Sequence, residues 1–172
     1  MFNHYKKVAL ALALASASMS AHAVQADITV WADVDPTLAL LKADGTPLTD
    51  VVEMTYRAGT GAAAGLAPWT EQVRVFTNDT DKDINVRLGA DAALQPHVAA
   101  PGAVAIPLTV SLNAVPITVA GVDFTKASLY PGSEMDGASK SMELKIAQTT
   151  PGTIAFGGQY RGMVTILMVQ KS

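Results

Sequence analysis

The chain has 172 residues, of which 49% are hydrophobic and only 16% charged, and its formal net charge is −3. This composition fits one domain with a hydrophobic core, and the scattered Lys and Arg residues argue against a nucleic-acid partner. The chain has no cysteine, which excludes disulfides and thiolate metal sites.

Residues 1–23 have the features of a secretory signal peptide. Lys6 and Lys7 form a positive start, and residues 8–15 are an apolar run too short to cross a bilayer, which takes about 20 residues. Ala21-His22-Ala23 is a small-residue cleavage pattern. Cleavage after Ala23 removes two of the 12 basic residues and none of the 15 acidic ones, so the net charge becomes about −5. We therefore expect an exported mature chain that begins at Val24.

Residues 24–34 alternate between apolar and polar side chains, which predicts a long half-buried strand. At about 3.3 Å per residue it would be about 33 Å long, and Asp35-Pro36 would end it because proline fixes φ and lacks an N–H donor. Two interpretations remain open: the first strand of an ordinary sandwich, or a strand that is added to the sheet of another copy. One face carries Val24, Ala26, Ile28, Val30, Ala32 and Val34, and the other carries Gln25, Asp27, Thr29, Trp31 and Asp33.

From residue 38 onward, apolar residues recur with a period of two, which predicts short strands separated by turns that contain Gly and Pro. The pattern favours an all-β sandwich, with no helix longer than a single turn. The expected strands are residues 38–43, 51–57, 69–77, 84–88, 104–112, 115–119, 122–129, 142–146 and 160–169. The expected loops and turns are residues 44–45, 58–68, 78–83, 89–102, 113–114, 130–140 and 149–153.

The sequence contains few residues that could carry out catalysis. His97 is the only histidine left after cleavage, and we expect it in the loop 89–102. A Ser-His-Asp mechanism would need this histidine as its base, but a lone loop histidine is usually a solvated surface residue. The sequence has no G-x-S-x-G, H-E-x-x-H or phosphate-loop motif. We therefore predict neither an enzyme nor a cofactor.

The acidic stretch at 79–83 resembles a calcium loop only in part. Asp79, Asp81 and Asp83 stand at alternate positions, as such a loop requires. However, Ile84 stands where the sharp turn needs glycine, and Ala90 stands where a bidentate Glu is needed. We interpret the stretch as a polar turn between two strands and predict no metal site.

Three segments of the mature chain together carry a family resemblance. They are DITVWADVDPTLALLKADG (27–45), VRVFTNDTDKDINVRL (73–88) and GGQYRGMVTILMV (157–169), which lie at both ends and in the centre. In this order and spacing they resemble the major pilins of the alternate chaperone–usher pathway (class 5, alpha-fimbrial), the group of the colonisation-factor fimbriae and cable pili. The absence of cysteine agrees with this branch.

The resemblance implies an all-β fold: an incomplete immunoglobulin-like sandwich that lacks its last strand and is completed by donor-strand exchange. It divides the chain into a signal peptide (1–23), a donor strand with its junction (24–36) and a pilin domain (37–172). Val24, Ala26, Ile28, Val30, Ala32 and Val34 would be the donor residues, and Asp35 and Pro36 the junction. Residues 160–169 and 38–43 would line the acceptor groove, through Leu38, Leu40, Tyr160, Gly162, Val164, Ile166 and Met168.

By the same resemblance, the protein would be the major structural subunit of a surface pilus that supports adhesion. Subunits would pass through the periplasm to the cell surface and polymerise head to tail. The implied partners are other copies of the chain, a periplasmic chaperone, an outer-membrane usher and a tip adhesin subunit. The resemblance implies no role for the loops 58–68 and 89–102.

Two other functions are considered. A monomeric, secreted carbohydrate-binding β-sandwich would use Trp31 or Trp69 against sugar rings, although a strand tryptophan more often packs in a core or an interface. A tip adhesin would generally need an added binding domain, and the mature chain has room for only one domain.

Overall fold

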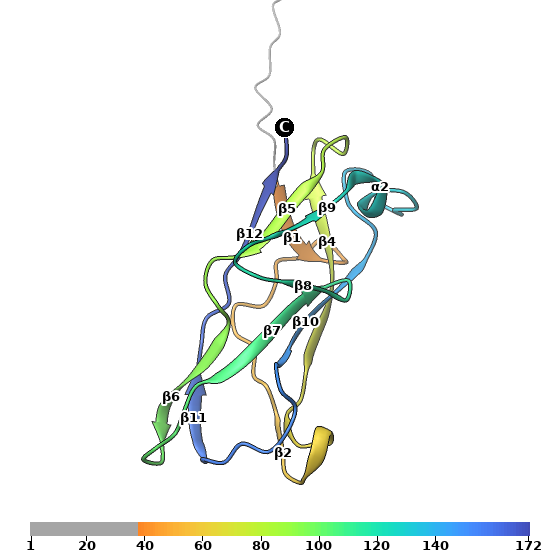
Figure 1. Cartoon of the computed structure of the whole chain (residues 1–172). Coiled ribbons are helices and arrows are strands. Elements are labelled where there is room, and N and C mark those ends of the chain that lie inside the picture. Colours follow the sequence, from red (N-terminus) through yellow and green to blue (C-terminus); the bar gives the residue numbers. More distant parts are fainter. Residues whose placement is uncertain (1–37) are drawn as a thin grey trace, which may run out of the picture. The chain divides into compact units, whose positions relative to one another are not determined.

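A computed structural model describes residues 38–172 of the chain, and most of its regular structure is β-strand (Figure 1). Its helical segments are the 3-10 turn η1 (Gly61–Ala63) and the single-turn helix α2 (Lys126–Leu129). No helix within residues 38–172 is long and apolar enough to span a membrane. The strands are β1 (Leu38–Lys42), β2 (Tyr56–Arg57), β3 (Gly65–Leu66), β4 (Trp69–Thr77), β5 (Ile84–Leu88), β6 (Ala93–Ala99), β7 (Ile106–Leu112), β8 (Val115–Ile117), β9 (Val122–Phe124), β10 (Met142–Gln148), β11 (Gly158–Arg161) and β12 (Ile166–Gln170).

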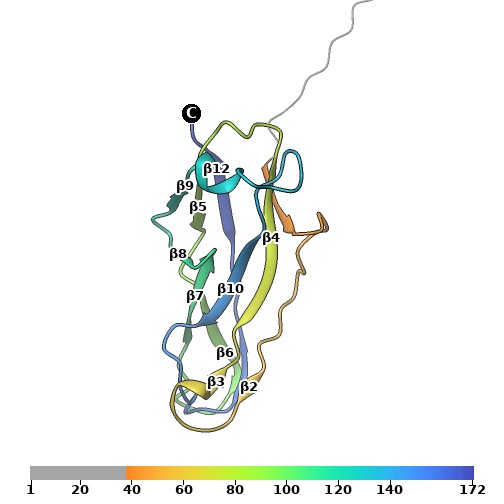
Figure 2. The same cartoon turned by 90° about the vertical axis from the view of Figure 1, so that its right-hand side faces the viewer.

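The strands form a β-sandwich in which every pairing is antiparallel. The larger sheet has the order β1-β4-β10-β7-β6-β11, and β8 also pairs with β7. The smaller sheet has the order β12-β5-β9, and β2 and β3 form a separate short ribbon. Figure 2 shows β4 and β10 of the larger sheet on one side of the domain, and β5 and β9 on the other. The predicted all-β sandwich is therefore confirmed.

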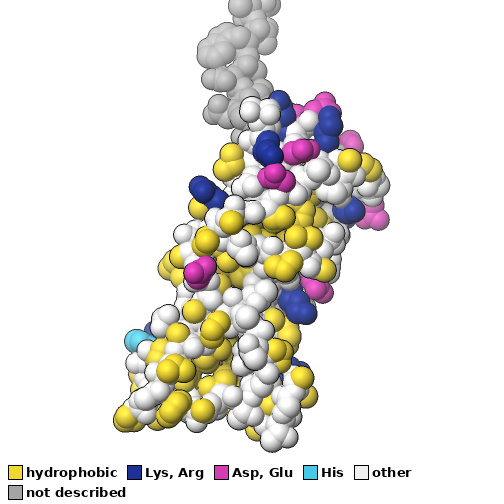
Figure 3. Space-filling view, viewed as in Figure 1, with side chains coloured by type: hydrophobic (Ala, Val, Ile, Leu, Met, Phe, Trp, Pro, Cys, Tyr) yellow, Lys and Arg dark blue, Asp and Glu magenta, His cyan; other side chains and the backbone are white. Residues whose placement is uncertain are grey.

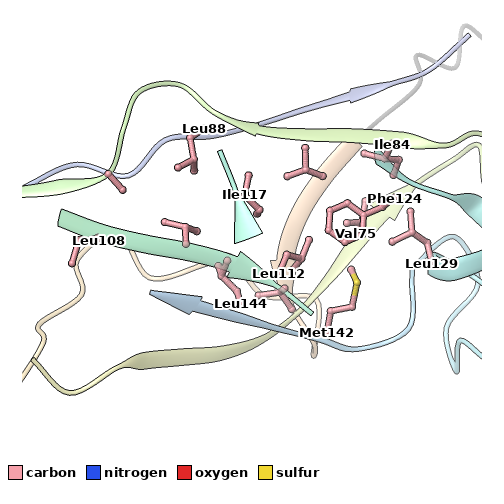
Figure 4. Close-up of a cluster of buried hydrophobic side chains, with 14 residues drawn as sticks. Val75, Ile84, Leu88, Leu108, Leu112, Ile117, Phe124, Leu129, Met142 and Leu144 are labelled. Atoms are coloured by element: carbon pink, nitrogen blue, oxygen red, sulfur yellow. The ribbon is translucent and has the colours of Figure 1, made fainter. Parts of the chain in front are cut away.

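The core lies between the two sheets and is built by the alternating residues of four predicted strands (Figure 4). Each of these strands places every second side chain inward, because successive side chains of a strand point to opposite faces. The residues concerned are Val73 and Val75 of β4, Ile84, Val86 and Leu88 of β5, Leu108, Val110 and Leu112 of β7, and Met142 and Leu144 of β10.

The predicted turn at 113–114 joins β7 to β8 as a tight hairpin. Leu112 pairs with Val115, so only two residues form the loop. Both have positive φ, 51° at Asn113 and 64° at Ala114, as a type I′ turn requires. Asparagine tolerates this conformation, but alanine pays a steric penalty between its Cβ and the carbonyl oxygen.

The predicted loop 130–140 is bound to β4 by hydrogen bonds. These bonds lie next to the end of the β4–β10 ladder, because Ser139 precedes the first residue of β10. Ser139 is fully buried; its Oγ accepts a hydrogen bond from the Val75 amide at 2.9 Å, and its amide donates to the Val75 carbonyl at 2.8 Å. Arg74 Nη1 donates to the Ser139 carbonyl at 2.9 Å, and Nη2 lies 3.3 Å from Glu134 Oε2. The loop therefore covers Arg74, which alternation places on the face opposite the core and which is nevertheless buried.

The prediction that residues 89–102 form a loop is wrong, because they contain strand β6. This strand pairs with β11 and with the start of β7, in the end of the domain farthest from β1 (Figure 1). All of its side chains are at least partly exposed, so no alternation marks it in the sequence. The pairing with β11 is also irregular: it passes from Val98 to Pro96 and skips His97, beside a proline that has no N–H to donate.

Other strand predictions need correction at their ends: the predicted strand 115–119 ends at Ile117, and the predicted strand 142–146 continues to Gln148. Residues 122–129 form a strand only as far as Phe124, because α2 begins at Lys126. The Asp83 carboxylate accepts a hydrogen bond from the Lys126 amide at 2.8 Å, which satisfies one of the free amides at the start of this turn. The strand predicted from residue 104 begins at Ile106, and Val104 is 68% exposed.

We predict that Ala114→Gly stabilises the domain by about 0.5–1 kcal/mol. Glycine removes the left-handed penalty of about 1–2 kcal/mol, partly offset by the larger chain entropy of an unfolded glycine. Ala147→Gly, within β10, is the control and should destabilise by about 0.5–1 kcal/mol. Urea unfolding of the purified protein measures both changes, and equal losses of stability would contradict the turn geometry.

A second prediction concerns the close contact of Gly162 with the start of β6. A Cβ on Gly162 would lie 2.2 Å from the Ala93 carbonyl oxygen, so the backbones must separate. Gly162→Ala should therefore lower the free energy of unfolding by about 1–3 kcal/mol. Gly157→Ala is the matched control, because a Cβ there meets nothing within 4 Å, and it should change stability by less than about 0.5 kcal/mol.

Candidate functional site: an open apolar groove

A groove with a volume of about 960 Å³ runs along the described domain. One side is formed by residues 48–54 and the other by residues 156–166. Its floor is formed by apolar side chains of the larger sheet, namely Trp69, Leu94, Ile106, Leu108, Leu144 and Ile146. In Figure 3, hydrophobic side chains predominate in the half of the domain that holds β6 and β11, whereas charged side chains gather at the end where β12 terminates.

The first side of the groove is an extended segment that lacks a strand partner among the described residues. Val52 and Met54 point inward and are half-buried, whereas Val51 is 79% exposed and Glu53 is exposed, so the alternation predicted for 51–57 is present over 51–54 but not at Tyr56, which is 47% exposed. Only Tyr56 and Arg57 are assigned to a strand, however, and that strand is β2, paired with β3. Within residues 38–172, the backbone of 48–54 makes no hydrogen bond, so its polar groups are free to pair with another strand.

The second side is formed where the chain passes from one sheet to the other. The predicted single strand 160–169 is wrong: β11 belongs to the larger sheet, β12 belongs to the smaller one, and residues 162–165 connect them. β11 pairs only with β6, and β12 only with β5. Their other edges therefore have no ladder partner within the described part of the chain.

On this second side, inward and outward side chains continue to alternate through the connection between β11 and β12. Tyr160, Val164 and Ile166 are half-buried, and the Tyr160 hydroxyl donates to the Phe156 carbonyl at 2.8 Å, which fixes the ring. Arg161 is exposed and Met163 is 85% exposed, so both face outward. The groove thus presents an apolar interior between two free backbone edges, which is the arrangement that an added β-strand requires.

The structure brings four of the seven predicted acceptor residues to the groove: Tyr160, Gly162, Val164 and Ile166. Leu38, Leu40 and Met168 are half-buried and pack against the core, where β1 and β12 lie close together, and they are not among the residues that line the groove. The predicted donor and junction residues, Val24, Ala26, Ile28, Val30, Ala32, Val34, Asp35 and Pro36, lie outside the described residues.

Sequence reasoning missed one whole side of the groove, residues 48–54. Their signal was the alternation around Val52 and Met54, but alternation does not say which strand is the neighbour. Trp69 was considered as a sugar-contacting residue, but it is half-buried and packs against the core at the groove floor. Trp31, the other residue considered for that role, lies outside the described residues.

Other candidate chemistry lies away from the groove. His97 is exposed in β6. The Asp79 carboxylate accepts from the Asp81 amide at 3.0 Å, as expected of a polar turn. Across residues 38–172, no group of three or more His, Asp or Glu side chains is arranged to hold a metal ion.

Comparison with known proteins gives the same family as the sequence motifs. The model for the CS1 type fimbrial major subunit matches residues 24–169. The chain is 34% identical to a CS1 fimbrial subunit of Escherichia coli over 168 residues, which cover 95% of each chain. It is 34% identical to a CFA/I fimbrial subunit of Escherichia coli O78:H11 (strain H10407 / ETEC) over 169 residues, which cover 95% of this chain and 96% of the relative.

A solved structure supports the fold as well as the family. The CooA pilin subunit from enterotoxigenic Escherichia coli superposes with a TM-score of 0.65 at 29% sequence identity, over 80% of this chain and 89% of that one. The resemblance to the colonisation-factor pilins is thereby confirmed. The chain belongs to the family of CS1-type fimbrial major subunits.

Proposed function

We propose that copies of this chain join by donor-strand exchange, with residues 24–34 of one copy filling the groove of the next. Membership of the family makes the protein a structural subunit of a cell-surface fimbrium, built from copies of itself. The single observation that carries the mode of joining is the groove itself, which is apolar inside and bounded by two backbone edges without strand partners in the described chain.

The energetics of filling the groove favour a stable contact. Inward side chains that fill the groove act as plugs: three sizeable ones at about 1.5–3 kcal/mol each would contribute about 4.5–9 kcal/mol before ordering costs, and a smaller fourth one would add less. Each backbone hydrogen bond along the two edges adds about 0.5–1.5 kcal/mol net. We assign the plugs to Ile28, Val30, Ala32 and Val34, because these residues share the apolar face of the segment.

The same contact accounts for a filament. The surface that gives the strand and the surface that receives it are different, so the interface is heterologous and each added copy exposes a new free groove. Such a contact extends head to tail without closing. Asp35 and Pro36 would form the junction between the inserted strand and the domain, because proline ends the extended run.

We further propose that the subunit reaches the surface through the periplasm in a protected form. An open groove exposes apolar surface and free backbone edges, which is an aggregation hazard. A periplasmic chaperone that lends a strand would cover the groove, and an outer-membrane usher would direct its replacement by residues 24–34 of the next copy. A tip adhesin subunit would occupy the end of the filament. The role of the chain is structural and involves no cofactor.

Deletion of residues 24–34 is expected to abolish fibres while leaving a subunit that can still be recovered from the periplasm in complex with its chaperone. The groove and the core of the described domain remain intact in this variant, but no strand is available to give. Electron microscopy of the cell surface measures the outcome. Fibres assembled from the deletion variant would refute donor-strand exchange through this segment.

Val30→Asp is expected to lower fibre yield by about tenfold or more, because a carboxylate would be forced into the apolar groove. Thr29→Asp is the matched control, since it introduces the same charge at the adjacent residue on the opposite face of the strand. Its fibre yield should remain close to that of the wild type. Equal yields from the two variants would show that the segment does not insert with alternate residues inward.

A further inference from the structure

Arg161 is the only cation among the described residues that line the groove. It lies at the end of β11 and is exposed, and its guanidinium makes no hydrogen bond or ion pair with another residue of 38–172. The opposite side of the groove carries the carboxylates of Asp50 and Glu53. A segment that inserts between these sides with acidic residues on its outer face is therefore attracted to one side and repelled by the other.

Residues 24–34 are such a segment, and the next step rests on the function proposed above. Their outer face carries Asp27, Trp31 and Asp33, and they contain no Lys or Arg. The only described groove residue that attracts these carboxylates is Arg161. An arginine guanidinium also stacks favourably on the face of a tryptophan ring.

The ends of the domain fix the direction in which the segment enters. Leu38, at the start of β1, pairs with Thr77, and Gln170, at the end of β12, donates to the Thr77 hydroxyl at 2.6 Å. The described chain therefore starts and ends at the same end of the domain, and β11 lies at the opposite end (Figure 1). In a row of equally oriented copies, the segment leaves the β1 end of one copy and enters the next at its β11 end. It then runs antiparallel to residues 158–166.

Side-chain size selects one register for this antiparallel pairing. Residues that face the same way stand opposite each other, so the apolar face of the segment meets the inward face of 158–166. If Val30 lies opposite Gly162, then Ala32 meets the large ring of Tyr160. A shift of two residues in either direction places Ala32 opposite a glycine and leaves a void. The selected register gives the pairs Val34–Gly158, Ala32–Tyr160, Val30–Gly162, Ile28–Val164 and Ala26–Ile166.

The register also determines what meets on the outer surface. Trp31 of the incoming segment lies directly opposite Arg161, Asp33 lies diagonally across from it, and the 85% exposed Met163 flanks the pair. We propose that Arg161 holds the inserted strand from outside, with its guanidinium stacked on the indole of Trp31 from the neighbouring copy. Because directly opposed side chains have Cβ atoms about 4.5–5.5 Å apart, the two groups are within reach. The strand is then held by its plugs on one face and by this contact on the other.

The absence of cysteine from the chain allows the register to be tested by disulfide trapping in whole fibres. Trp31→Cys is combined with Arg161→Cys, and in two comparison variants with Gln159→Cys or Met163→Cys. After oxidation, boiled fibres are separated on a non-reducing gel. We expect a ladder of covalent multimers with Arg161→Cys, because only that pair has the spacing for a disulfide.

The possible results separate the register from the proposed function. A stronger ladder with Gln159→Cys or Met163→Cys, or intact fibres without a ladder in any variant, would overturn the register and the Arg161 contact while leaving strand exchange in place. A disulfide confined to the monomer would show that the segment fills its own groove, and would overturn strand exchange itself.

The contact itself is tested by a double-mutant cycle on fibres, which needs no cysteine. Trp31→Ala and Arg161→Ala should each accelerate fibre dissociation in guanidinium about threefold to tenfold. The double variant should be no faster than the faster single variant, since the contact is already lost. Arg87→Ala, an exposed arginine of β5 outside the groove, is the control and should leave the rate unchanged. Fully multiplicative effects of the two substitutions would overturn the contact.

Discussion

The described domain leaves two facing backbone edges without hydrogen-bonded strand partners, and its other features follow from this gap. The amides and carbonyls of residues 48–54 make no hydrogen bond within 38–172, and the edges of β11 and β12 that face them have no ladder. Backbone polar groups above an apolar floor are costly unless they are paired. The side chains of Trp69 and Ile146 remain only half-buried for the same reason. A strand from outside satisfies both needs at once, because it supplies hydrogen bonds at its edges and apolar side chains on its inner face.

The strands that sequence alternation located correctly are those with one face against the core. Val73 and Val75 of β4, and the inward residues of β5, β7 and β10, are buried because the opposite sheet covers them. β6 escaped detection because burial, which produces alternation, is weak along it. The break between β11 and β12 was also invisible, since Tyr160, Val164 and Ile166 keep their inward phase while the chain changes sheets. Alternation records which face of a segment is buried, and it carries no information on which sheet the segment joins.

The same limit applies to the groove. Residues 160–169 were expected from the family resemblance to line one side, and Tyr160 and Ile166 do line the groove, whereas Met168 does not. The opposite side was expected at 38–43, but residues 48–54 form it. Residues 51–54 alternate and 38–42 are mostly apolar, but neither pattern shows that β1 is already paired with β4 and lies next to β12, where Leu40 and Met168 pack against the core. The partner of a segment is decided by contacts distant in sequence, and these arise only when the whole domain is assembled.

The division between a complete core and an incomplete groove links folding to assembly. Val75, Leu112 and Met142 are buried in the described domain alone, which gives each subunit a core before any strand arrives. Ile146 and Val164 are only half-buried, and their burial is left to the neighbour. A strand that binds the folded groove and not the unfolded chain stabilises the fold by mass action. If residues 24–34 are that strand, unfolding a subunit within the filament requires the inserted strand to leave first. The resistance of the filament to heat and denaturant is then set by the rate at which a strand leaves its groove, more than by the core of any single subunit.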